Sequence, residues 1–239
     1  MPRYLSVRFC PETIFRRTLW VIAALVGASL FAAFLGVGLG HRRLMGLSDL
    51  VHLDREHNLP TLFSTIQLFS AGSLAWFVGG REAVFSMRWL WRFLGAGLCW
   101  IAIDEAVGIH ELANELDIGR LHEISYFRFA WVVPAFAVVA VCAAVLLKLL
   151  LVLPRQTAAM LVVSGLIFIA GSLGMEMLSA PYYQPYGQEG WTYTMCYTLE
   201  ETLEMLGPAL FIRTALRYAI RKQDEAGQGV DAAPASVPR

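Results

Sequence analysis

Charged residues are scarce in this sequence, since Lys, Arg, Asp and Glu make up only 16% of its 239 residues. A typical soluble domain has about 25%. The formal net charge is zero, so electrostatic attraction to nucleic acid is missing and we expect no nucleic-acid partner. Hydrophobic residues make up 57% instead, a composition typical of a protein that lies largely within a lipid bilayer.

Cysteine motifs and common catalytic motifs are also lacking. The four cysteines form no CxxC pair, which argues against a disulfide framework and against a cysteine zinc site. No HExxH, P-loop or dinucleotide-binding glycine pattern occurs, and no Glu-x-x-His motif accompanies the acidic residues. These absences leave the chemistry of the chain to residues inside its hydrophobic stretches.

Six apolar stretches run along the chain, each near the roughly 20 residues that a helix needs to cross the hydrocarbon core. They are 18–40, 60–79, 89–110, 129–153, 157–178 and 193–215. Strands are not expected, because an open sheet leaves its backbone unsatisfied in lipid. The sequence therefore predicts an all-α polytopic integral membrane bundle of six transmembrane helices.

The distribution of Lys and Arg predicts the orientation of this bundle. With a cytoplasmic N-terminus, the non-cytoplasmic segments carry five of the 19 basic residues, and the cytoplasmic segments carry the other 14. The five are Arg42, Arg43, Arg55, Arg120 and Arg128. Basic residues favour the cytoplasmic side, so both termini are expected there, and the cell inner (plasma) membrane is the expected location.

The same pattern divides the chain into three parts. Residues 1–17 form a cytoplasmic N-terminal segment, and residues 18–222 form the six-helix membrane domain. Residues 223–239 are polar, small and rich in Gly and Pro, so we expect a disordered cytoplasmic tail.

Ionisable residues within the spans are the main functional signal, because a charge costs several kcal/mol there and usually has a role. They lie in three spans, and in each case near the predicted non-cytoplasmic end. The residues are Asp104, Glu105, His110, Glu111, Glu176, Glu200, Glu201 and Glu204. Their convergence at one depth predicts a shared site.

Small residues indicate which way these side chains face, because they allow helices to approach closely. Gly97 and Gly108 share a helical face with Asp104, Gly207 shares one with Glu204, and Gly165 shares one with Glu176. We therefore expect these stripes to face the interior of the bundle. Ser64, Thr65 and Gln67 in the second span are expected to hydrogen-bond a neighbouring helix, or else to add polar ligands to the site.

Packed carboxylates in a low dielectric share protons, bind a cation or pair with an arginine, for which Arg120 and Arg128 are the nearest candidates. A carboxylate and imidazole set suits zinc, iron or manganese. The leading hypothesis is a divalent transition metal at the site. Its expected ligands are Glu105, His110, Glu111, Glu176, Glu200, Glu201 and Glu204, with Glu201, Glu204 and Asp104 as the expected catalytic residues.

A metal at this depth would activate water or oxygen. The leading functional interpretation is therefore a membrane metalloenzyme, either a hydrolase or an oxidoreductase, acting on a lipid-like or amphipathic substrate. A proton- or cation-coupled transporter or sensor is the first alternative, and an accessory membrane subunit braced by the same acids is the second. The only partner expected besides the substrate is the lipid bilayer, and the oligomeric state stays open.

Overall fold

The structure is a computed structural model that describes residues 10–38, 47–114, 131–182 and 190–231. Within these residues every regular element is a helix and no strand occurs, which confirms the all-helical prediction. The long helices are α1 (Pro11–Ala33), α3 (Leu59–Arg81), α4 (Phe85–Val107), α6 (Val132–Val152), α7 (Arg155–Ile169) and α9 (Trp191–Asp231). The short ones are η1 (Phe34–Gly38), α2 (Leu47–Val51), α5 (Ile109–Asn114), η4 (Ala170–Met175), α8 (Glu176–Ser179) and η5 (Ala180–Tyr182).

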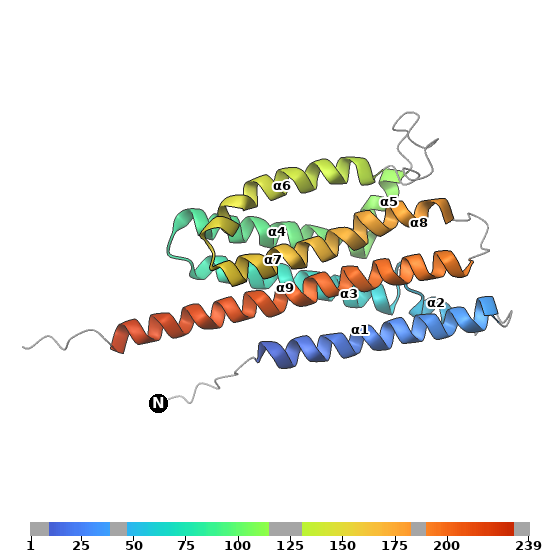
Figure 1. The fold of residues 1–239 in the computed structure, drawn as a ribbon, viewed down its shortest axis with the longest axis horizontal. Helices are drawn as coiled ribbons and strands as arrows, with labels where there is room; N and C mark the ends of the chain where they lie inside the picture. The colour runs from blue at the N-terminus through green and yellow to red at the C-terminus, as the bar shows by residue number, and fades with distance from the viewer. Residues whose placement is uncertain (1–9, 39–46, 115–130, 183–189, 232–239) are drawn as a thin grey trace, which may run out of the picture.

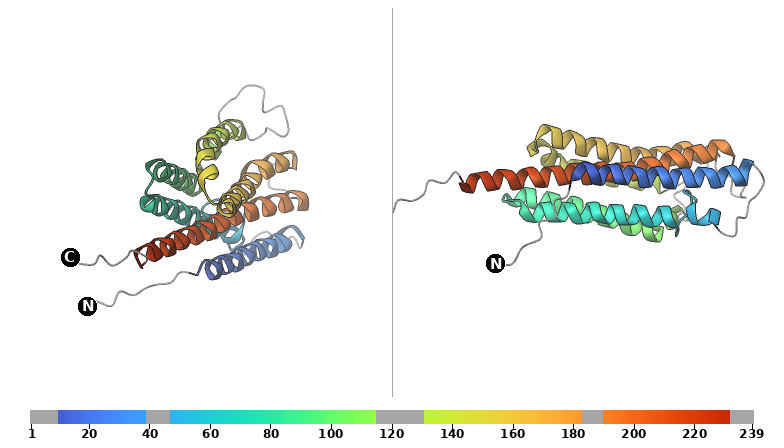
Figure 2. Two further views of the ribbon diagram at one scale, coloured as in Figure 1. Left: turned by 60° about the vertical axis from the view of Figure 1, so that its left-hand side comes forward. Right: turned by 90° about the horizontal axis from the view of Figure 1, so that it is seen from below.

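The long helices lie side by side in one elongated bundle (Figure 1). Helix α9 contacts α1, α3 and α7, and α3 and α4 form the most closely packed pair, while α6 lies on the outside against α4. The start of α1, the turn between α3 and α4 and the final part of α9 lie at one end of the bundle (Figures 1 and 2). The short helices α2, α5 and α8 lie at the other end, where α3 and α9 begin.

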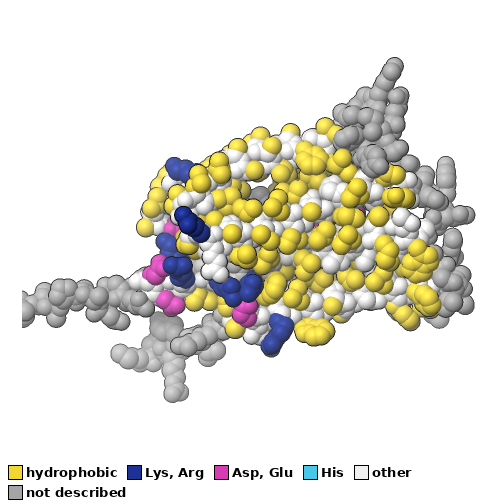
Figure 3. Space-filling view, viewed as in Figure 1, with side chains coloured by type: hydrophobic (Ala, Val, Ile, Leu, Met, Phe, Trp, Pro, Cys, Tyr) yellow, Lys and Arg dark blue, Asp and Glu magenta, His cyan; other side chains and the backbone are white. Residues whose placement is uncertain are grey.

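Four helical segments in the described residues are long and apolar enough to cross a membrane. They are Pro11–Gly36, Leu59–Arg81, Val132–Val152 and Arg155–Tyr182. Large apolar side chains such as Trp20, Trp100 and Leu151 are more than half exposed, and one face of the bundle is hydrophobic along most of its length (Figure 3). The fold is therefore compatible with a membrane protein. The two further predicted spans correspond to α4 and α9, and the six-span count stays a prediction.

Glycines set the spacing between α3 and α4. A Cβ atom added at Gly72 would lie 2.7 Å from the Gly95 carbonyl oxygen, and one at Gly95 would lie 2.7 Å from the Gly72 carbonyl oxygen. The two backbones therefore touch at this crossing, as small residues allow in membrane helices. Gly97 and Gly165 instead have no atom within 4 Å of an added Cβ, so the prediction that they face the interior was wrong. Gly207 packs against Phe168, as its stripe predicted.

Two helix ends differ from the sequence prediction. Helix α4 stops at Val107 rather than at His110, because Gly108 adopts a left-handed conformation with φ of 70° and caps the helix. Helix α9 runs on to Asp231, although the predicted membrane domain ends at Lys222. The division of the chain into three parts stays a prediction.

The segment between α2 and α3 has a fixed shape that matters for the site. Asn58 caps α3 by accepting a hydrogen bond from the Thr61 N–H at 3.1 Å. Its amide nitrogen donates to the carbonyl oxygens of His52 at 2.6 Å and Arg55 at 2.7 Å. One asparagine thus holds residues 52–58 against the start of α3, and with them the acidic residues of this turn.

Candidate carboxylate site

The acidic residues gather at the end of the bundle where α3 and α9 begin, here called the carboxylate end. Asp104 and Glu105 lie in the last turn of α4, His110 lies in α5, Glu176 begins α8, and three more glutamates lie in α9. The carboxylate end is defined by Glu105, His110, Glu176, Glu200, Glu201 and Glu204. Elements that are far apart in the sequence therefore bring their acids to one region, as predicted.

Asp104 holds His110 through two contacts. The His110 backbone N–H donates to Asp104 Oδ1 at 2.9 Å, and His110 Nδ1 lies 3.0 Å from Asp104 Oδ2. The left-handed conformation of Gly108 ends α4 directly before α5, and the change of chain direction there brings His110 beside Asp104. Burial lowers the pKa of His110, but the hydrogen bond and the negative charge of Asp104 outweigh it and raise the pKa to about 9.

Glu56 faces the other side of the same imidazole, a role that the sequence prediction missed. Its Oε1 lies 3.9 Å from His110 Nε2. A Cβ atom at Gly108 would overlap the Glu56 carboxylate, so glycine is needed here both for its φ and for the space it leaves. The signal in the sequence is the position of Glu56 shortly before the predicted span 60–79.

Glu105, Glu201 and Glu204 form the inner part of the cluster. Glu201 has Glu204 and Glu105 among its main charge neighbours, and Glu204 has Glu105 and His110 among its own. Gly171 in the π-helical turn η4 makes room for them, since a Cβ there would lie 2.9 Å from Glu204 Cγ and 2.9 Å from the Glu200 carbonyl oxygen. Single π-helical turns within α-helices occur frequently at functional sites.

Glu176 and Glu200 form the outer part of the cluster. Their side chains are hydrogen-bonded to each other, and the Glu200 side chain is buried. Trp131 Nε1 donates to Glu176 Oε1 at 3.3 Å, and the Trp131 ring lies 5.1 Å from the His110 ring. Trp131 thus connects the outer carboxyl pair to the histidine.

Carboxyl groups outnumber bases in this region. In the described part of the chain, His110 is the one base among the main charge neighbours of Glu105, Glu200, Glu201 and Glu204. Asp54 adds a further acid near Glu201, and it accepts a hydrogen bond from the Tyr193 hydroxyl at 2.9 Å. Among the described residues the cluster therefore has an excess of acidic groups, which shared protons, a bound cation or an arginine must compensate.

The predicted metal ligands are not arranged as a finished coordination sphere. No group of three or more His, Cys, Asp or Glu residues has metal-binding geometry in the ranges that the structure describes. Glu111 belongs to α5, but its side chain lies outside the described part. Arg120 and Arg128, which were the predicted basic partners, also lie outside the described residues.

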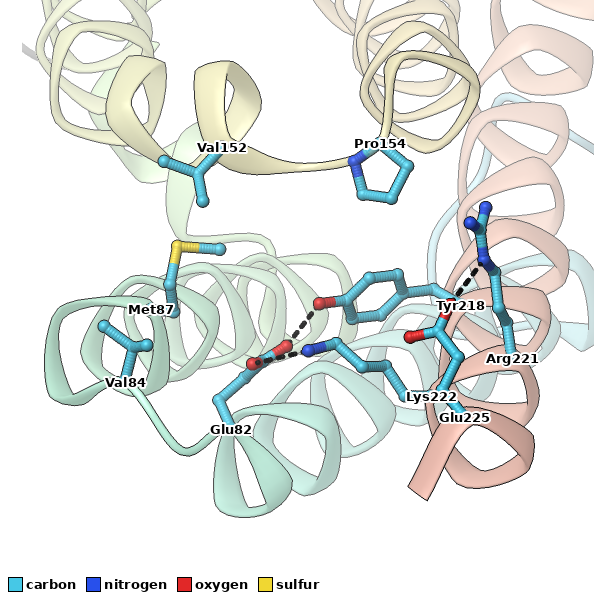
Figure 4. Close-up of a pocket in the computed structure, with 9 residues that line it drawn as sticks. All are labelled: Glu82, Val84, Met87, Val152, Pro154, Tyr218, Arg221, Lys222 and Glu225. Carbon is cyan, nitrogen blue, oxygen red and sulfur yellow. Dashed lines mark hydrogen bonds and ion pairs between the residues drawn. The ribbon is translucent and has the colours of Figure 1, made fainter. Parts of the chain in front are cut away.

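The opposite end of the bundle, here called the basic end, carries Arg88, Arg213, Arg217 and Lys222, and it contains a second polar site. A cavity of about 270 Å³ lies beside the Glu82 carboxylate (Figure 4). The Tyr218 hydroxyl donates to Glu82 Oε1, and Lys222 Nζ lies 3.5 Å from Glu82 Oε2. The Arg88 side chain donates to the Glu82 backbone carbonyl at 3.0 Å. This acid is thus fully paired.

These features define a class of protein: a helical bundle with membrane-length apolar helices and a cluster of buried acids at one end. Residues 18–219 match a family described as a domain of unknown function, DUF8692, and the chain belongs to that family. No curated protein and no solved structure matches the chain.

Proposed function

We propose that the chain is a multi-pass protein of the plasma membrane with six spans, formed by α1, α3, α4, α6, the α7–α8 segment and α9. The clustering of Lys and Arg at the basic end, visible in Figure 3, supports a cytoplasmic position for that end. The carboxylate end then faces the non-cytoplasmic side.

The function proposed for the carboxylate end is the binding of a divalent metal ion. The observation that carries this proposal is the placement of His110, whose Nδ1 is held by Asp104 while Nε2 faces Glu56 at 3.9 Å. Metal-binding histidines usually donate one ring N–H to a carboxylate and ligate through the other nitrogen. Glu56, Glu105, Glu201 and Glu204 would complete the ligand set, and Asp104 would orient the imidazole.

A metal held there would act on a substrate from the membrane. Zinc, iron and manganese all suit a set of carboxylates with one imidazole, and each lowers the pKa of bound water. The proposed activity is that of a metal-dependent membrane hydrolase or oxidoreductase acting on a lipid-like or amphipathic molecule. Glu201 and Glu204 are the proposed acid and base groups for this step.

A second candidate, a proton-coupled transporter or sensor, has its own supporting observation. Two carboxyl groups that hydrogen-bond to each other, as Glu176 and Glu200 do, must share a proton. This pair would bind and release a proton as the charge of the neighbouring cluster changes. Metal and proton would then compete for one set of acids.

The test is a titration of detergent-purified, chelator-treated protein with Mn²⁺ and Zn²⁺. Wild type should bind about one ion per chain, and Glu204→Gln and His110→Ala should each weaken binding at least tenfold. Glu82→Gln, at the basic end, is the matched control and should bind as wild type does. If wild type binds neither ion, the metal function is wrong and the proton-coupled function replaces it.

A further inference from the structure

Two polar side chains of α3 lie buried without a hydrogen-bond partner among the described residues. Ser64 is 5% exposed and Gln67 is 6% exposed. The Ser64 hydroxyl and both polar atoms of the Gln67 carboxamide have no partner there. The sequence predicts either hydrogen bonds from these residues to a neighbouring helix or polar ligands for the site, and the described helices supply no such hydrogen bond.

The register between α3 and α4 sets the depth of these groups. Gly72 lies against Cys99 and Gly95, and Gly79 lies against Trp91, in two antiparallel helices. Counting outward along both helices from Gly72 brings Ser64 level with Glu105, and Gln67 level with Ala102, one turn further in. The buried face of α3 that carries both residues also packs against α9, the helix of Glu201 and Glu204.

A buried amide without any hydrogen-bond partner would cost too much free energy at this depth. Buried polar groups without a protein partner are normally satisfied by ordered water, which itself needs two to four polar partners. Gln67 offers a donor and an acceptor, Ser64 offers both in one hydroxyl, and the carboxylate of Glu105, at the level of Ser64, would be a further acceptor. These groups therefore meet the requirements of a buried water site.

We infer that Gln67 and Ser64 bind water at the inner boundary of the carboxylate cluster, and that this water belongs to the hydration shell of the bound cation. The first part stands on the buried, unpartnered groups of α3, and the second rests on the proposed metal function. Gln67 Oε1 accepts a hydrogen bond from a water whose oxygen faces the cation. The cation is thus held through water on the α3 side and by carboxylates on the α4 and α9 sides.

The water site is tested without metal, by the melting temperature of chelator-treated Gln67→Leu. If water is hydrogen-bonded to the amide, this substitution removes those hydrogen bonds and leaves the water with too few partners, so the melting temperature falls by several degrees. If no water contacts the amide, leucine replaces an unpaired polar group, and the melting temperature should rise or stay the same. Either of these results overturns the inference. Gln156→Leu, on the exposed start of α7, controls for the change of residue type and should have no effect.

Ser64→Ala is the milder second variant if Gln67→Leu does not fold. It should lower the melting temperature, and an unchanged or raised value would overturn the water site just as clearly. The link to the cation is tested separately with bound Mn²⁺ and electron–nuclear double resonance in ¹⁷O-enriched water. Gln67→Leu should lose one exchangeable water signal and bind Mn²⁺ about ten- to a hundredfold more weakly.

The melting temperatures and the Mn²⁺ measurements distinguish a failure of the metal function from a failure of the water site. If wild type does not bind Mn²⁺, the metal function and the hydration of its cation are wrong, while the melting temperatures still decide the water site. If wild type binds Mn²⁺ and Gln67→Leu keeps every water signal and the full affinity, the metal function stands. The role of Gln67 in hydrating the cation is then overturned.

Discussion

At the basic end of the bundle each acid considered has a base or a donor beside it, whereas at the carboxylate end acids lie mainly beside other acids. Glu12 contacts Arg213 at 2.8 Å and Arg217 at 2.6 Å, and the buried Glu82 is held by Tyr218 and Lys222. Glu201, by contrast, has Glu204, Glu105, Asp54 and Glu176 as its main charge neighbours. Paired groups stabilise a fold, whereas an excess of one sign destabilises it unless a ligand compensates. The basic end is therefore expected to stabilise the fold, and the carboxylate end is the one proposed to bind a ligand.

The largest effect is expected from Gly108→Ala, which would disturb the carboxylate end most. The added methyl group would overlap Glu56, and a φ of 70° is strained for alanine. We therefore expect the free energy of unfolding to fall by about 2–3 kcal/mol and the affinity for the cation to be lost. Thermal unfolding and Mn²⁺ titration measure both. Gly97→Ala in the same helix meets open space and should stabilise α4 by up to about 1 kcal/mol.

Neutralising one acid at each end should change stability in opposite directions. In chelator-treated protein, Glu82→Gln removes the negative charge that pairs with Lys222 and leaves only a neutral acceptor for the Tyr218 hydroxyl, and should cost about 1–3 kcal/mol. Glu204→Gln relieves repulsion among carboxylates and should raise the melting temperature. Equal changes of the same sign in the two variants would remove the basis of the comparison.

The pH dependence of stability should identify the His110–Asp104 pair. The folded pKa of His110, about 9, lies above the value of about 6.5 for free histidine. The stabilisation by this pair is therefore fully present below about pH 6.5 and is lost as the pH rises through 9. His110 is 27% exposed, so after solvent screening we expect a loss of about 1–2 kcal/mol.

Melting curves of metal-free protein between pH 6 and 10 measure this loss. Asp104→Asn should flatten the profile over that range, because the asparagine cannot favour the charged imidazole. A profile that is the same in wild type and Asp104→Asn would show that the pair does not control the titration.

The smallest effect is expected from Glu12→Gln at the basic end. Glu12 is an exposed partner of Arg213 and Arg217, and exposed ion pairs contribute little to stability. Its melting temperature should stay close to that of wild type, and the small difference should vanish in high salt. A drop as large as that of Glu82→Gln would mean that exposure does not distinguish these pairs.

Periodicity and composition predicted the helical fold and the convergence of acids from α4, α8 and α9, because both follow from which residues tolerate lipid. The details of the site depend on contacts that no spacing reveals. Glu56 meets His110 because Gly108 turns the chain and leaves space for a carboxylate, although the two residues are far apart in sequence. The glycine stripes predicted the packed helix faces only in part. Gly207 packs against Phe168 as expected, whereas Gly97 faces open space.

If a cation compensates the acids at the carboxylate end, metal analysis of unchelated, detergent-purified protein should detect it. Wild type and Glu82→Gln should each contain about one transition-metal ion per chain, and Glu204→Gln and His110→Ala should lose the ion. Wild-type protein without stoichiometric metal, or equal metal content in all four proteins, would contradict this expectation.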